Sequence, residues 1–343
     1  MSLIIEQNRS LREFNTFGVE ASSAYFAEAH DDQQIGEALA QAQHLGVPLL
    51  ILGGGSNLVL TANVNALVLR MASRGIRVIE DDGERVVIEA EAGEPWHPFV
   101  LHSLGLGLGL GLCGLENLSL IPGTVGAAPI QNVGAYGVEI KDVFAGLTAL
   151  DRQTGRLVEF DLQACQFGYR DSLFKRQAGR YIILRVRFAL QRTANLKLEY
   201  GPLRQWLVQH AIQSPTPMDV SRAVCAIRSE KLPDPRQLGN AGSFFKNPLV
   251  SAALADGLRQ RFADLVAFAQ ADGQVKLAAG WLIERAGWKG YRRGDVGVHR
   301  LQALVLVNYG QATGRQILQL AEDIQADVAE QFGVQLEIEP NII

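Results

Sequence analysis

The stretch LLILGGGSN, residues 49–57, joins a short apolar run to three consecutive glycines. The apolar run predicts a buried strand, and the glycines predict a sharp turn at its end. Upstream, apolar residues recur at helical spacing between Asp31 and Gly46, with an acidic cap at one end and a terminating glycine at the other. We therefore expect a βαβ-like unit near the start of the chain.

The glycine turn at residues 53–57 has two alternative roles. Backbone amides without side-chain obstruction can wrap a pyrophosphate, but a glycine cluster can also be no more than a tight turn. The motif is not the GxGxxG of dinucleotide-binding folds, and no P-loop lysine follows it. The turn by itself leaves both roles open.

A second stretch of small residues, IPGTVGAAPIQNVGAYG, covers residues 121–137. Small side chains let a flat ring system and a phosphate chain lie directly on the backbone, whereas the alternative is a glycine-rich loop packed for steric reasons. Two such stretches suit a long dinucleotide, which favours the ligand hypothesis.

Periodicity predicts the remaining elements. An Asp82-Gly83 turn between two apolar segments predicts a hairpin. The segment Leu232-Pro233-Asp234-Pro235 ends a helix that runs up from Asp219. Further strands are expected at Ile76–Ile79, Val86–Ile88, Tyr181–Leu190, Leu304–Val307 and Val334–Ile338, and helices at Lys276–Arg285 and Thr313–Phe332. The middle of the chain is therefore mixed α+β.

The composition is that of a folded globular protein and limits the classes of partner. Among the 343 residues, 48% are apolar and 20% are charged, and the formal net charge is −4. No long run of one sign occurs, so a broad nucleic-acid footprint is not expected, and anionic ligands need a local cluster of Lys and Arg. A chain of this length can form two or three packed units.

The cysteines and the apolar segments bear on the compartment. Cys113, Cys165 and Cys225 are odd in number and lack the CxxC spacing of zinc sites, which favours a reducing compartment. Met1–Arg12 lacks the apolar core of a signal peptide. Gly105–Leu112 is too short and too rich in glycine to span a bilayer as a helix. None of the six histidines forms an HExxH or other metal pair, so no metal site is expected.

Residues 167–172, FGYRDS, place Arg170 between an aromatic residue and an acid. Such a context can hold a guanidinium rigidly toward an anion. The alternative is a surface pair of an arginine with an aspartate. The segment by itself favours this alternative, because exposed pairs are common and contribute little to stability.

Residues 239–248, GNAGSFFKNP, set Ser243 after a glycine and before two aromatic residues that can exclude water. The pattern predicts a buried hydroxyl at a turn. No GxSxG elbow surrounds Ser243 and no histidine lies nearby in sequence, so a hydrolase triad is not supported. Taken alone, the segment favours a turn-forming serine.

Near the C-terminus, residues 336–339 read LEIE. In a strand, alternation places Glu337 and Glu339 on the face opposite Leu336. A solvated strand face is the alternative to a functional carboxylate.

These segments, taken in order, resemble the UDP-N-acetylenolpyruvoylglucosamine reductases. The similarity runs from Asn15-Thr16-Phe17-Gly18 to Glu339 and rests on GGGSN, IPGTVGAAPIQNVGAYG, FGYRDS, SEKLPDP and GNAGSFFKNP. It implies an α+β protein with a vanillyl-alcohol-oxidase-like FAD-binding fold. The two FAD-binding subdomains would be residues 1–69 and 70–230, followed by a C-terminal α/β substrate-binding domain, residues 231–343, whose last strand returns to the active site.

The segment Leu196–His210, with Tyr200 before Gly201, resembles the longer of the two types in this family. In that type a tyrosine-bearing loop folds over the nucleotide sugar. The resemblance therefore implies that the loop near residues 196–210 covers the substrate.

The resemblance also implies an activity. The chain would reduce UDP-N-acetylglucosamine enolpyruvate to UDP-N-acetylmuramate with NADPH, through non-covalently bound FAD, in peptidoglycan precursor synthesis. NADPH and the sugar nucleotide would use one site in turn, in a ping-pong cycle. We expect a cytoplasmic monomer without a nucleic-acid partner and without membrane insertion.

Site residues carry over from the family by motif position. The catalytic residues would be Arg170, Ser243 and Glu339. Contacts to the UDP-sugar would come from Tyr136, Tyr200, Lys231, Asn247, Lys289 and Gln302. Contacts to FAD would come from Gly53, Gly54, Gly55, Ser56, Asn57, Leu58, Ile121, Pro122, Gly123, Thr124, Gly126, Ala127 and Gly134.

One departure from the family pattern concerns the acid. The family usually has a proline immediately before the catalytic glutamate, whereas here Ile338 precedes Glu339 and Pro340 follows it. Glu337 therefore remains the alternative carboxylate.

Two other functions stay open at this point. A protein with the same FAD fold can oxidise a small alcohol or a sugar lactone and pass the electrons to oxygen, although GNAGSFFKNP opposes this. A nucleotide-sugar sensor without activity is the other alternative, although Arg170, Ser243 and Glu339 are all present.

Overall fold

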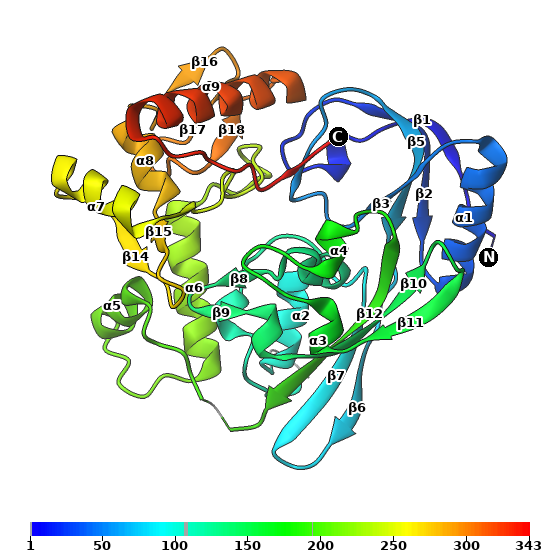
Figure 1. The fold of residues 1–343 in the computed structure, drawn as a ribbon. Coiled ribbons are helices and arrows are strands. Elements are labelled where there is room, and N and C mark those ends of the chain that lie inside the picture. Colours follow the sequence, from blue (N-terminus) through cyan, green and yellow to red (C-terminus); the bar gives the residue numbers. More distant parts are fainter. Residues whose placement is uncertain (1, 106–108, 194) are drawn as a thin grey trace. The chain divides into compact units, whose positions relative to one another are not determined.

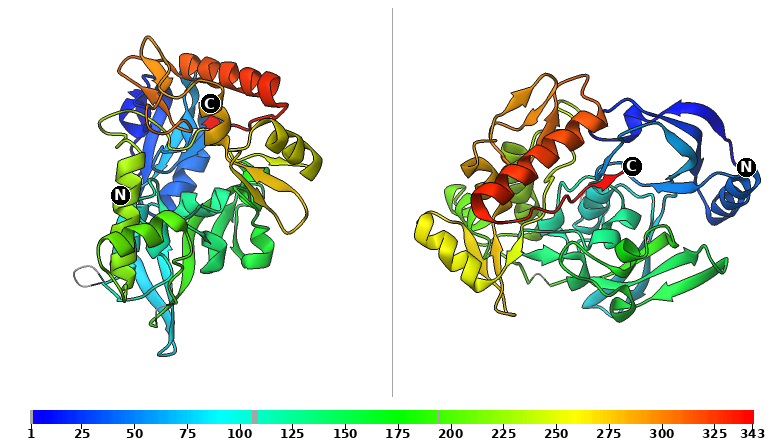
Figure 2. Two further views of the ribbon diagram at one scale, coloured as in Figure 1. Left: turned by 90° about the vertical axis from the view of Figure 1, so that its left-hand side faces the viewer. Right: turned by 45° about the horizontal axis from the view of Figure 1, so that its top comes forward.

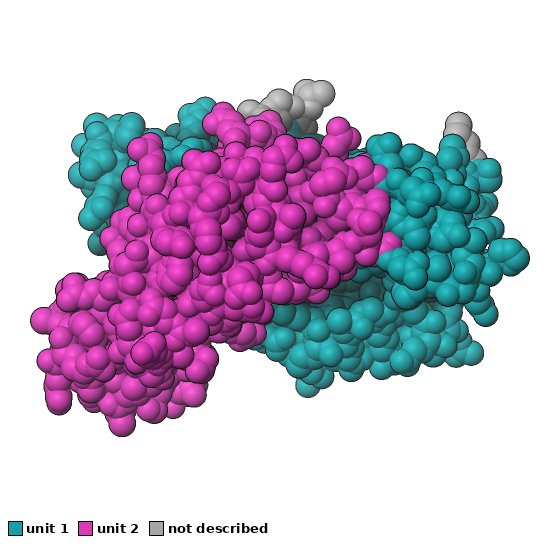
Figure 3. All heavy atoms as spheres, turned by 90° about the horizontal axis from the view of Figure 1, so that it is seen from above, with its two compact units in different colours: residues 1–9, 23–54, 65–230 teal, residues 10–22, 55–64, 231–343 magenta. Residues whose placement is uncertain are grey.

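The computed structural model describes residues 2–105, 109–193 and 195–343 (Figure 1). The expectation for the apolar stretch Gly105–Leu112 falls partly on residues 106–108, which lie outside the described residues. The chain forms two compact units, shown in different colours in Figure 3. Unit 1 comprises residues 1–9, 23–54 and 65–230, and unit 2 comprises residues 10–22, 55–64 and 231–343. Each unit is therefore assembled from segments that are distant in sequence.

A four-stranded sheet and one helix form the first part of unit 1: β1 (Glu6–Ser10), β2 (Ser22–Ala29), α1 (Asp32–Leu45), β3 (Leu49–Leu52) and β5 (Val64–Met71). The strand order is β1-β2-β5-β3, and β3 pairs with β5 in parallel. Helix α1 begins after Asp31, whose side chain accepts a hydrogen bond from the backbone of Gln34, and it ends at Gly46, whose φ of 66° is left-handed. The expected helix and the strand at residues 49–52 are confirmed.

A five-stranded antiparallel sheet follows, made of β6 (Ile76–Asp81), β7 (Arg85–Glu91), β10 (Phe144–Asp151), β11 (Arg156–Phe160) and β12 (Tyr181–Gln191). Its strand order is β11-β10-β12-β7-β6. The hairpin of β6 and β7 turns at Asp82-Gly83, where the Asp82 carboxylate accepts a hydrogen bond of 2.7 Å from the Arg85 backbone. Both the hairpin and the strand at residues 181–190 are as predicted.

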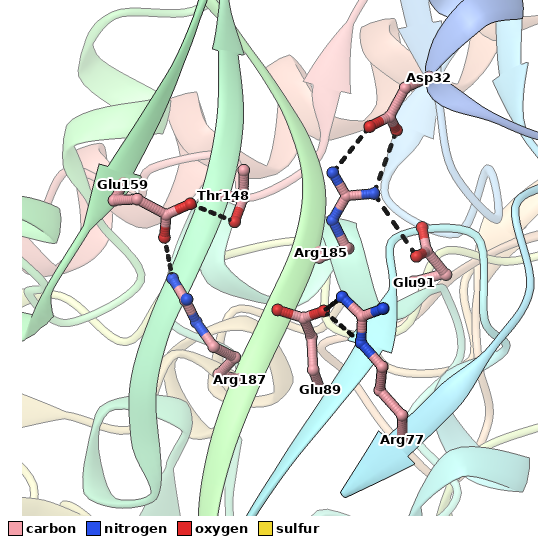
Figure 4. A network of polar contacts seen from close by, with 8 residues as sticks. All are labelled: Asp32, Arg77, Glu89, Glu91, Thr148, Glu159, Arg185 and Arg187. Atoms are coloured by element: carbon pink, nitrogen blue, oxygen red, sulfur yellow. Dashed lines mark hydrogen bonds and ion pairs between the residues drawn. The ribbon is translucent and has the colours of Figure 1, made fainter. Parts of the chain in front are cut away.

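Strand β12 alternates between buried apolar and charged side chains. Val186 and Phe188 are fully buried, whereas Arg185 lies in the polar network of Figure 4. There its guanidinium contacts Asp32 of α1 at 2.7 Å and Glu91 of β7 at 3.6 Å. The other pairs of the network are Arg77 with Glu89 and Arg187 with Glu159, and Glu159 also accepts a hydrogen bond from Thr148. One face of the strand thus packs in the core while the other carries charge.

Helices, two short strands and the loops between them carry the motif segments of unit 1. They are α2 (Trp96–Ser103), η2 (Glu116–Leu118), η3 (Val125–Gln131), β8 (Gly134–Ala135), β9 (Val138–Glu139), η4 (Ile140–Asp142), α3 (Leu162–Cys165), α4 (Leu173–Arg176), α5 (Gly201–Gln209) and α6 (Pro217–Lys231). The rings of Trp96, Phe99 and Phe188 pack together with centroids 5.1–5.9 Å apart and join α2 to the five-stranded sheet. Helix α6 ends at Lys231, directly before Leu232-Pro233, as predicted.

Unit 2 has its own core of apolar side chains around Phe244, Phe245 and Leu282. Its elements are η1 (Arg12–Phe14), β4 (Leu58–Val59), β13 (Leu249–Val250), α7 (Ala252–Arg261), β14 (Ala267–Ala269), β15 (Val275–Leu277), α8 (Ala279–Arg285), β16 (Arg292–Arg293), β17 (Val296–Val298), β18 (Leu306–Asn308), α9 (Gly314–Phe332) and β19 (Asn341–Ile342). Helix α9 packs against β17 and β18 (Figure 2). Thr313 and Gln316 form a capping box at its start, so the predicted helix is confirmed.

Three sequence-based boundaries in unit 2 are wrong. The helix expected at Lys276–Arg285 starts only at Ala279, because residues 275–277 form β15, which pairs with β13 on one side and β14 on the other. The strand expected at Leu304–Val307 is β18, two residues later. Val334–Ile338 is no strand, since only Ile338 forms a bridge, to Phe245. In the first case the pairing of β15 with β13 and β14 overrides the local helical pattern.

No helix within the described ranges is long and apolar enough to cross a membrane. Over the same described residues, no group of three or more His, Cys, Asp or Glu side chains comes together as a metal site. The three cysteines are free thiols, and Cys113 and Cys165 are buried.

Candidate active site

In unit 1 the two glycine stretches lie directly against one another. A Cβ atom added to Gly54 would come within 2.8 Å of the Gly123 Cα, and one added to Gly53 would come within 2.8 Å of the Thr124 Oγ1. A Cβ atom added to Gly126 would come within 2.5 Å of the Ala92 Cβ. These glycines are therefore required for packing. The same packing leaves two loops of bare backbone side by side, with Gly54 exposed, and this suits a phosphate chain or a flat ring.

The rest of the first glycine motif belongs to unit 2. Gly55 has a φ of 63° and packs against the backbone of Phe14, where a side chain does not fit. The Asn57 carbonyl accepts a hydrogen bond of 3.0 Å from the Asn341 backbone, and Leu58 pairs with the same residue as β4 meets β19. Ser56 is half-buried. Residues 55–58 thus also anchor the C-terminal strand.

Arg170 is held in a strained and well-supported position. Its φ is 52°, in the left-handed region that non-glycine residues rarely adopt. Its Nη2 donates a hydrogen bond of 2.8 Å to the Gly134 carbonyl, and its backbone carbonyl accepts one from the Lys175 ammonium. Asp171 pairs with Arg176. The guanidinium is therefore tied to the 134–137 segment of the second small-residue stretch.

Asn132 fastens the segment of Arg170 to that stretch, and its role was not predicted from the sequence. It is fully buried and has a φ of 44°. Its amide donates to the Gly168 carbonyl at 3.0 Å and to the Glu139 carboxylate at 3.1 Å, and its Oδ1 accepts from the backbone of Lys141. An asparagine inside a glycine-rich motif is a sequence signal for a residue in the left-handed conformation. This signal could have identified Asn132.

The two tyrosines expected at the substrate are in contact. The rings of Tyr136 and Tyr200 meet edge to face with centroids 5.1 Å apart. Burial raises the pKa of Tyr136 to about 12, with Tyr200 adding to the shift and Arg228 opposing it. The Tyr136 phenol therefore stays protonated at neutral pH and can donate a hydrogen bond. Tyr200 is 46% exposed, so part of this residue is open to solvent.

Asn117 holds both tyrosine-bearing segments and was also missed in the sequence. Its buried side-chain amide donates to the carbonyls of Tyr136 and Lys197, each at 2.9 Å. No local pattern announces this contact, because Lys197 lies 80 residues away in the chain. The loop that carries Tyr200 is thus fastened to the 134–137 segment by one side chain.

Ser243 in unit 2 does not match the expected environment. Its two aromatic neighbours, Phe244 and Phe245, are buried, but Ser243 itself is exposed, so the prediction of a buried hydroxyl is wrong. The reason is the preceding Gly242, whose left-handed φ of 72° turns the chain so that the aromatic rings enter the core and the serine does not. The hydroxyl is therefore presented at the surface of unit 2.

The C-terminal carboxylates differ in their surroundings. Ile338 bridges Phe245, the Glu339 backbone N–H donates to the Phe244 carbonyl at 2.9 Å, and Glu339 is half-buried. This pairing brings Glu339 beside the segment of Ser243. Glu337 is exposed and forms an ion pair with Lys246. Within unit 2, the backbone of Glu339 is thus hydrogen-bonded to Phe244, the residue that follows Ser243. Arg170 belongs to unit 1.

Two of the expected substrate residues lie at the first turn of α8. The Asn247 Oδ1 accepts a hydrogen bond of 3.0 Å from the Ala279 backbone, so this side chain already caps the helix. The Gln302 Oε1 lies 3.5 Å from the position that a Cβ on Gly280 would take. Lys289 forms an ion pair of 2.8 Å with Glu284, and Lys231 is exposed. Both amides thus lie at the first turn of α8, and the two lysines remain near solvent.

The fold and the glycine-lined loops are those of an FAD-binding protein. Residues 23–161 match the family described as "FAD binding domain". A solved structure of UDP-N-acetylenolpyruvylglucosamine reductase from Thermus caldophilus superposes with a TM-score of 0.64 at 23% identity and covers 99% of this chain and 98% of its own, which shows the shared fold. The expected FAD-binding fold with a C-terminal domain is thereby confirmed.

Residues 234–343 match the family described as "UDP-N-acetylenolpyruvoylglucosamine reductase, C-terminal domain". The reductase of that name from Pseudomonas fluorescens strain Pf0-1 is 70% identical over 99% of both chains, and the one from Pseudomonas aeruginosa PAO1 is 62% identical over the full length of both. This chain belongs to the UDP-N-acetylenolpyruvoylglucosamine reductase family. It is an FAD-dependent oxidoreductase of peptidoglycan precursor synthesis that uses NADPH, as the resemblance implied.

Proposed function

We propose that this chain reduces UDP-N-acetylglucosamine enolpyruvate with Arg170, Ser243 and Glu339 as the catalytic residues, in a ping-pong cycle in which NADPH and the sugar use one site in turn. One observation carries the proposal: the pairing of Glu339 with Phe244 brings the acid next to the serine within unit 2. Membership of the family supplies the substrate class. The residue roles follow from the chemistry that this substrate requires.

The cofactor would rest on the bare backbone of Gly53, Gly54 and residues 121–127, with Gly134 beside it. The close approach of Gly54 to Gly123 supports this assignment, because any side chain there would fill the cradle. When bound, FAD supplies hydride transfer from NADPH to the enolpyruvyl double bond. We nominate no residue for a covalent link, so the protein would hold FAD by packing and hydrogen bonds.

Arg170 would stabilise the charge that develops on the substrate. Hydride addition at the terminal carbon leaves enolate-like negative charge on the carboxyl group, and a guanidinium supplies fixed donors and positive charge there. The bond to the Gly134 carbonyl orients Arg170 before substrate binds, so little reorganisation is needed. Glu339 would orient this site or donate a proton.

Ser243 would donate the proton to the carbon next to the carboxyl group. A hydroxyl is ordinarily a weak acid, but the carbon at that stage is strongly basic, and exclusion of water by the bound ligands strengthens the electrostatic interactions around it. Its exposed position on unit 2 leaves the hydroxyl open to a ligand.

The nucleotide sugar would be bound through ionic contacts to its phosphates and through hydrogen bonds to its other polar groups. The chain has a net charge of −4, but Lys231 and Lys289 would supply positive charge locally, where the phosphates bind. Lys289 would exchange its ion pair with the exposed Glu284 for a phosphate. Tyr136, Tyr200, Asn247 and Gln302 would contribute hydrogen bonds, with the loop near residues 196–210 folding over the sugar as in the longer type of the family.

We further propose a cytoplasmic monomer organised as residues 1–69, 70–230 and 231–343. The free thiols Cys113, Cys165 and Cys225 support a reducing compartment. Size-exclusion chromatography with light scattering tests the oligomeric state, and a mass near 37.4 kDa is expected.

The purified protein is expected to be yellow and to oxidise NADPH only when the enolpyruvyl sugar nucleotide is present. A visible spectrum detects the flavin, and its release into the supernatant on heating shows that it is not covalently bound. NADPH absorbance, followed with and without the sugar nucleotide, measures turnover. NADPH-independent oxidation of a small alcohol with oxygen uptake would support an oxidase, and a colourless protein that binds the sugar without turnover would support a sensor.

Tyr200→Phe is expected to raise the KM for the sugar nucleotide by roughly two- to tenfold, because a neutral hydrogen bond contributes about 0.5–1.5 kcal/mol. Steady-state kinetics at saturating NADPH measure it. Tyr25→Phe, in the strand β2, is the matched control and should leave the KM unchanged. An unchanged KM for Tyr200→Phe with normal folding would remove Tyr200 from the site.

A further inference from the structure

Leu120, directly before the 121–127 segment, has a φ of 58°. A left-handed conformation is unfavourable for a residue with a branched apolar side chain and persists only where the surroundings impose it. Leu120 is not among the residues expected in the site, and its conformation sets the direction in which the chain enters Ile121-Pro122-Gly123.

Both backbone groups of Leu120 are bound by side chains from different helices. Its N–H donates a hydrogen bond of 3.0 Å to the Nδ1 of His97, in the first turn of α2. Its carbonyl accepts one of 3.3 Å from the Nε of Arg228, near the end of α6. All three residues belong to unit 1, so the clamp on Leu120 lies within one compact body.

The acceptor role of Nδ1 determines the tautomer of His97. With Nδ1 accepting, the proton of the neutral ring sits on Nε2, which faces the Cys225 Sγ at 3.9 Å. Burial lowers the pKa of His97, and the charge of Arg228 lowers it further. Among the residues that the structure describes, Cys225 and Arg228, both on α6, are the titratable and charged groups that interact with the His97 ring.

Side chains on one face of α6 form hydrogen bonds with residues 119 and 120. Ser221, Cys225 and Arg228 are spaced by four and three residues and therefore share a helix face. The Ser221 hydroxyl is 2.7 Å from that of Ser119, and both residues are buried. The chain before the cofactor segment is consequently held at two successive residues.

The first turn of α2 holds the same loop at two further points. The Trp96 backbone N–H donates to the Gly123 carbonyl at 3.0 Å, and its indole donates to the Leu118 carbonyl at 2.8 Å. Gly123 is the residue whose Cα lies against Gly54. A shift at Leu120 therefore acts directly on the meeting point of the two glycine loops.

We propose that His97 and Arg228 are positioning residues of the cofactor site, which hold Leu120 left-handed, and that protonation of His97 on Nδ1 releases Leu120 and weakens FAD binding. The inference rests on the proposed assignment of residues 121–127 to FAD. Neither residue is among the catalytic residues proposed above. Each acts through the backbone of Leu120.

The first test removes and restores the acceptor. His97→Phe should raise the dissociation constant for FAD about tenfold or more, because it leaves the Leu120 N–H without its partner. His97→Asn can place its Oδ1 near the position of Nδ1 and should stay within about threefold of wild type. FAD released from the purified holoenzyme on ultrafiltration, quantified by fluorescence, measures this without turnover.

The second test uses pH on the wild-type protein. Since the pKa of His97 lies below its ordinary value of 6.5, the ring is neutral at pH 7 and FAD affinity is at its full value. As pH falls through that pKa the proton competes with the Leu120 N–H, and the dissociation constant rises by up to about tenfold per pH unit, as for one proton. His97→Asn should show a flat response over the same range.

Gly54→Val separates failure of this inference from failure of the FAD assignment. If Gly54→Val weakens FAD binding while His97→Phe and wild type at low pH do not, the assignment stands and the positioning role is overturned. If none of them changes FAD binding, the assignment of the glycine loops fails as well. Should His97→Phe fold poorly, the pH series on wild type and His97→Asn still decides.

Discussion

Replacement of Ser243 by alanine is expected to slow the half-reaction with the enolpyruvyl sugar by roughly 10²–10⁴-fold, the range typical of a lost general acid. The half-reaction with NADPH should stay near the wild-type rate, because it needs no proton from this hydroxyl. Stopped-flow absorbance of the flavin follows each half-reaction separately. The substitution removes one oxygen atom from an exposed position, so little loss of stability is expected.

Ser251→Ala is the matched control for Ser243→Ala. Ser251 also lies in unit 2, where its side chain accepts a hydrogen bond from Leu254 at the start of α7. Loss of this cap should lower the free energy of unfolding by about 1 kcal/mol without a selective effect on either half-reaction. Equal slowing of both half-reactions in Ser243→Ala would mean that the serine holds the flavin or the shared site and is not the acid.

Glu339→Gln is expected to retain FAD and sugar binding and to lose most of the second half-reaction, by roughly 10²–10³-fold if it supports the charge on the substrate carboxyl group. Glu337→Gln should keep both half-reactions close to wild type, because the exposed Glu337 carboxylate is already paired with Lys246. Single-turnover reoxidation rates, with the sugar dissociation constant from titration, compare the two variants.

The pair of glutamate variants also checks the register of the C-terminal segment. Lys246→Met removes the partner of Glu337 and serves as the control for loss of that ion pair. If Glu337→Gln is the crippled variant and Glu339→Gln turns over normally, the assignment is displaced by two residues, and the changed proline position at Pro340 has moved the functional carboxylate.

Local sequence was sufficient where an element is determined by neighbours along the chain. Helix α1 was predicted from its Asp31 cap and Gly46 end, and both caps are formed as expected. The β6–β7 turn at Asp82-Gly83 likewise depends on a few adjacent residues. The stop of α6 follows from the missing N–H and fixed φ of proline.

The candidate site was predictable only in part. The motifs named the segments of Gly53, Gly123 and Arg170, because loops packed backbone to backbone require glycine, and glycine is visible in a sequence. They did not show that Ser243 is exposed, since that depends on how Gly242 turns the chain against the core of unit 2. The choice between the two glutamates depends similarly on the bridge from Ile338 to Phe245.

What the sequence by itself determined is the family, several of the helices and strands, and the residue types that the chemistry needs. What only the tertiary structure decided is how those residues are held. Asn117 donates hydrogen bonds to the carbonyls of Tyr136 and Lys197, and Asn132 donates one to the carbonyl of Gly168, in the segment of Arg170. His97 and Arg228 form hydrogen bonds with the backbone of Leu120. The physical reason is distance along the chain. Caps, turns and periodicity act over a few residues, whereas Arg228 reaches a carbonyl 108 residues away, and such contacts exist only once the chain has folded.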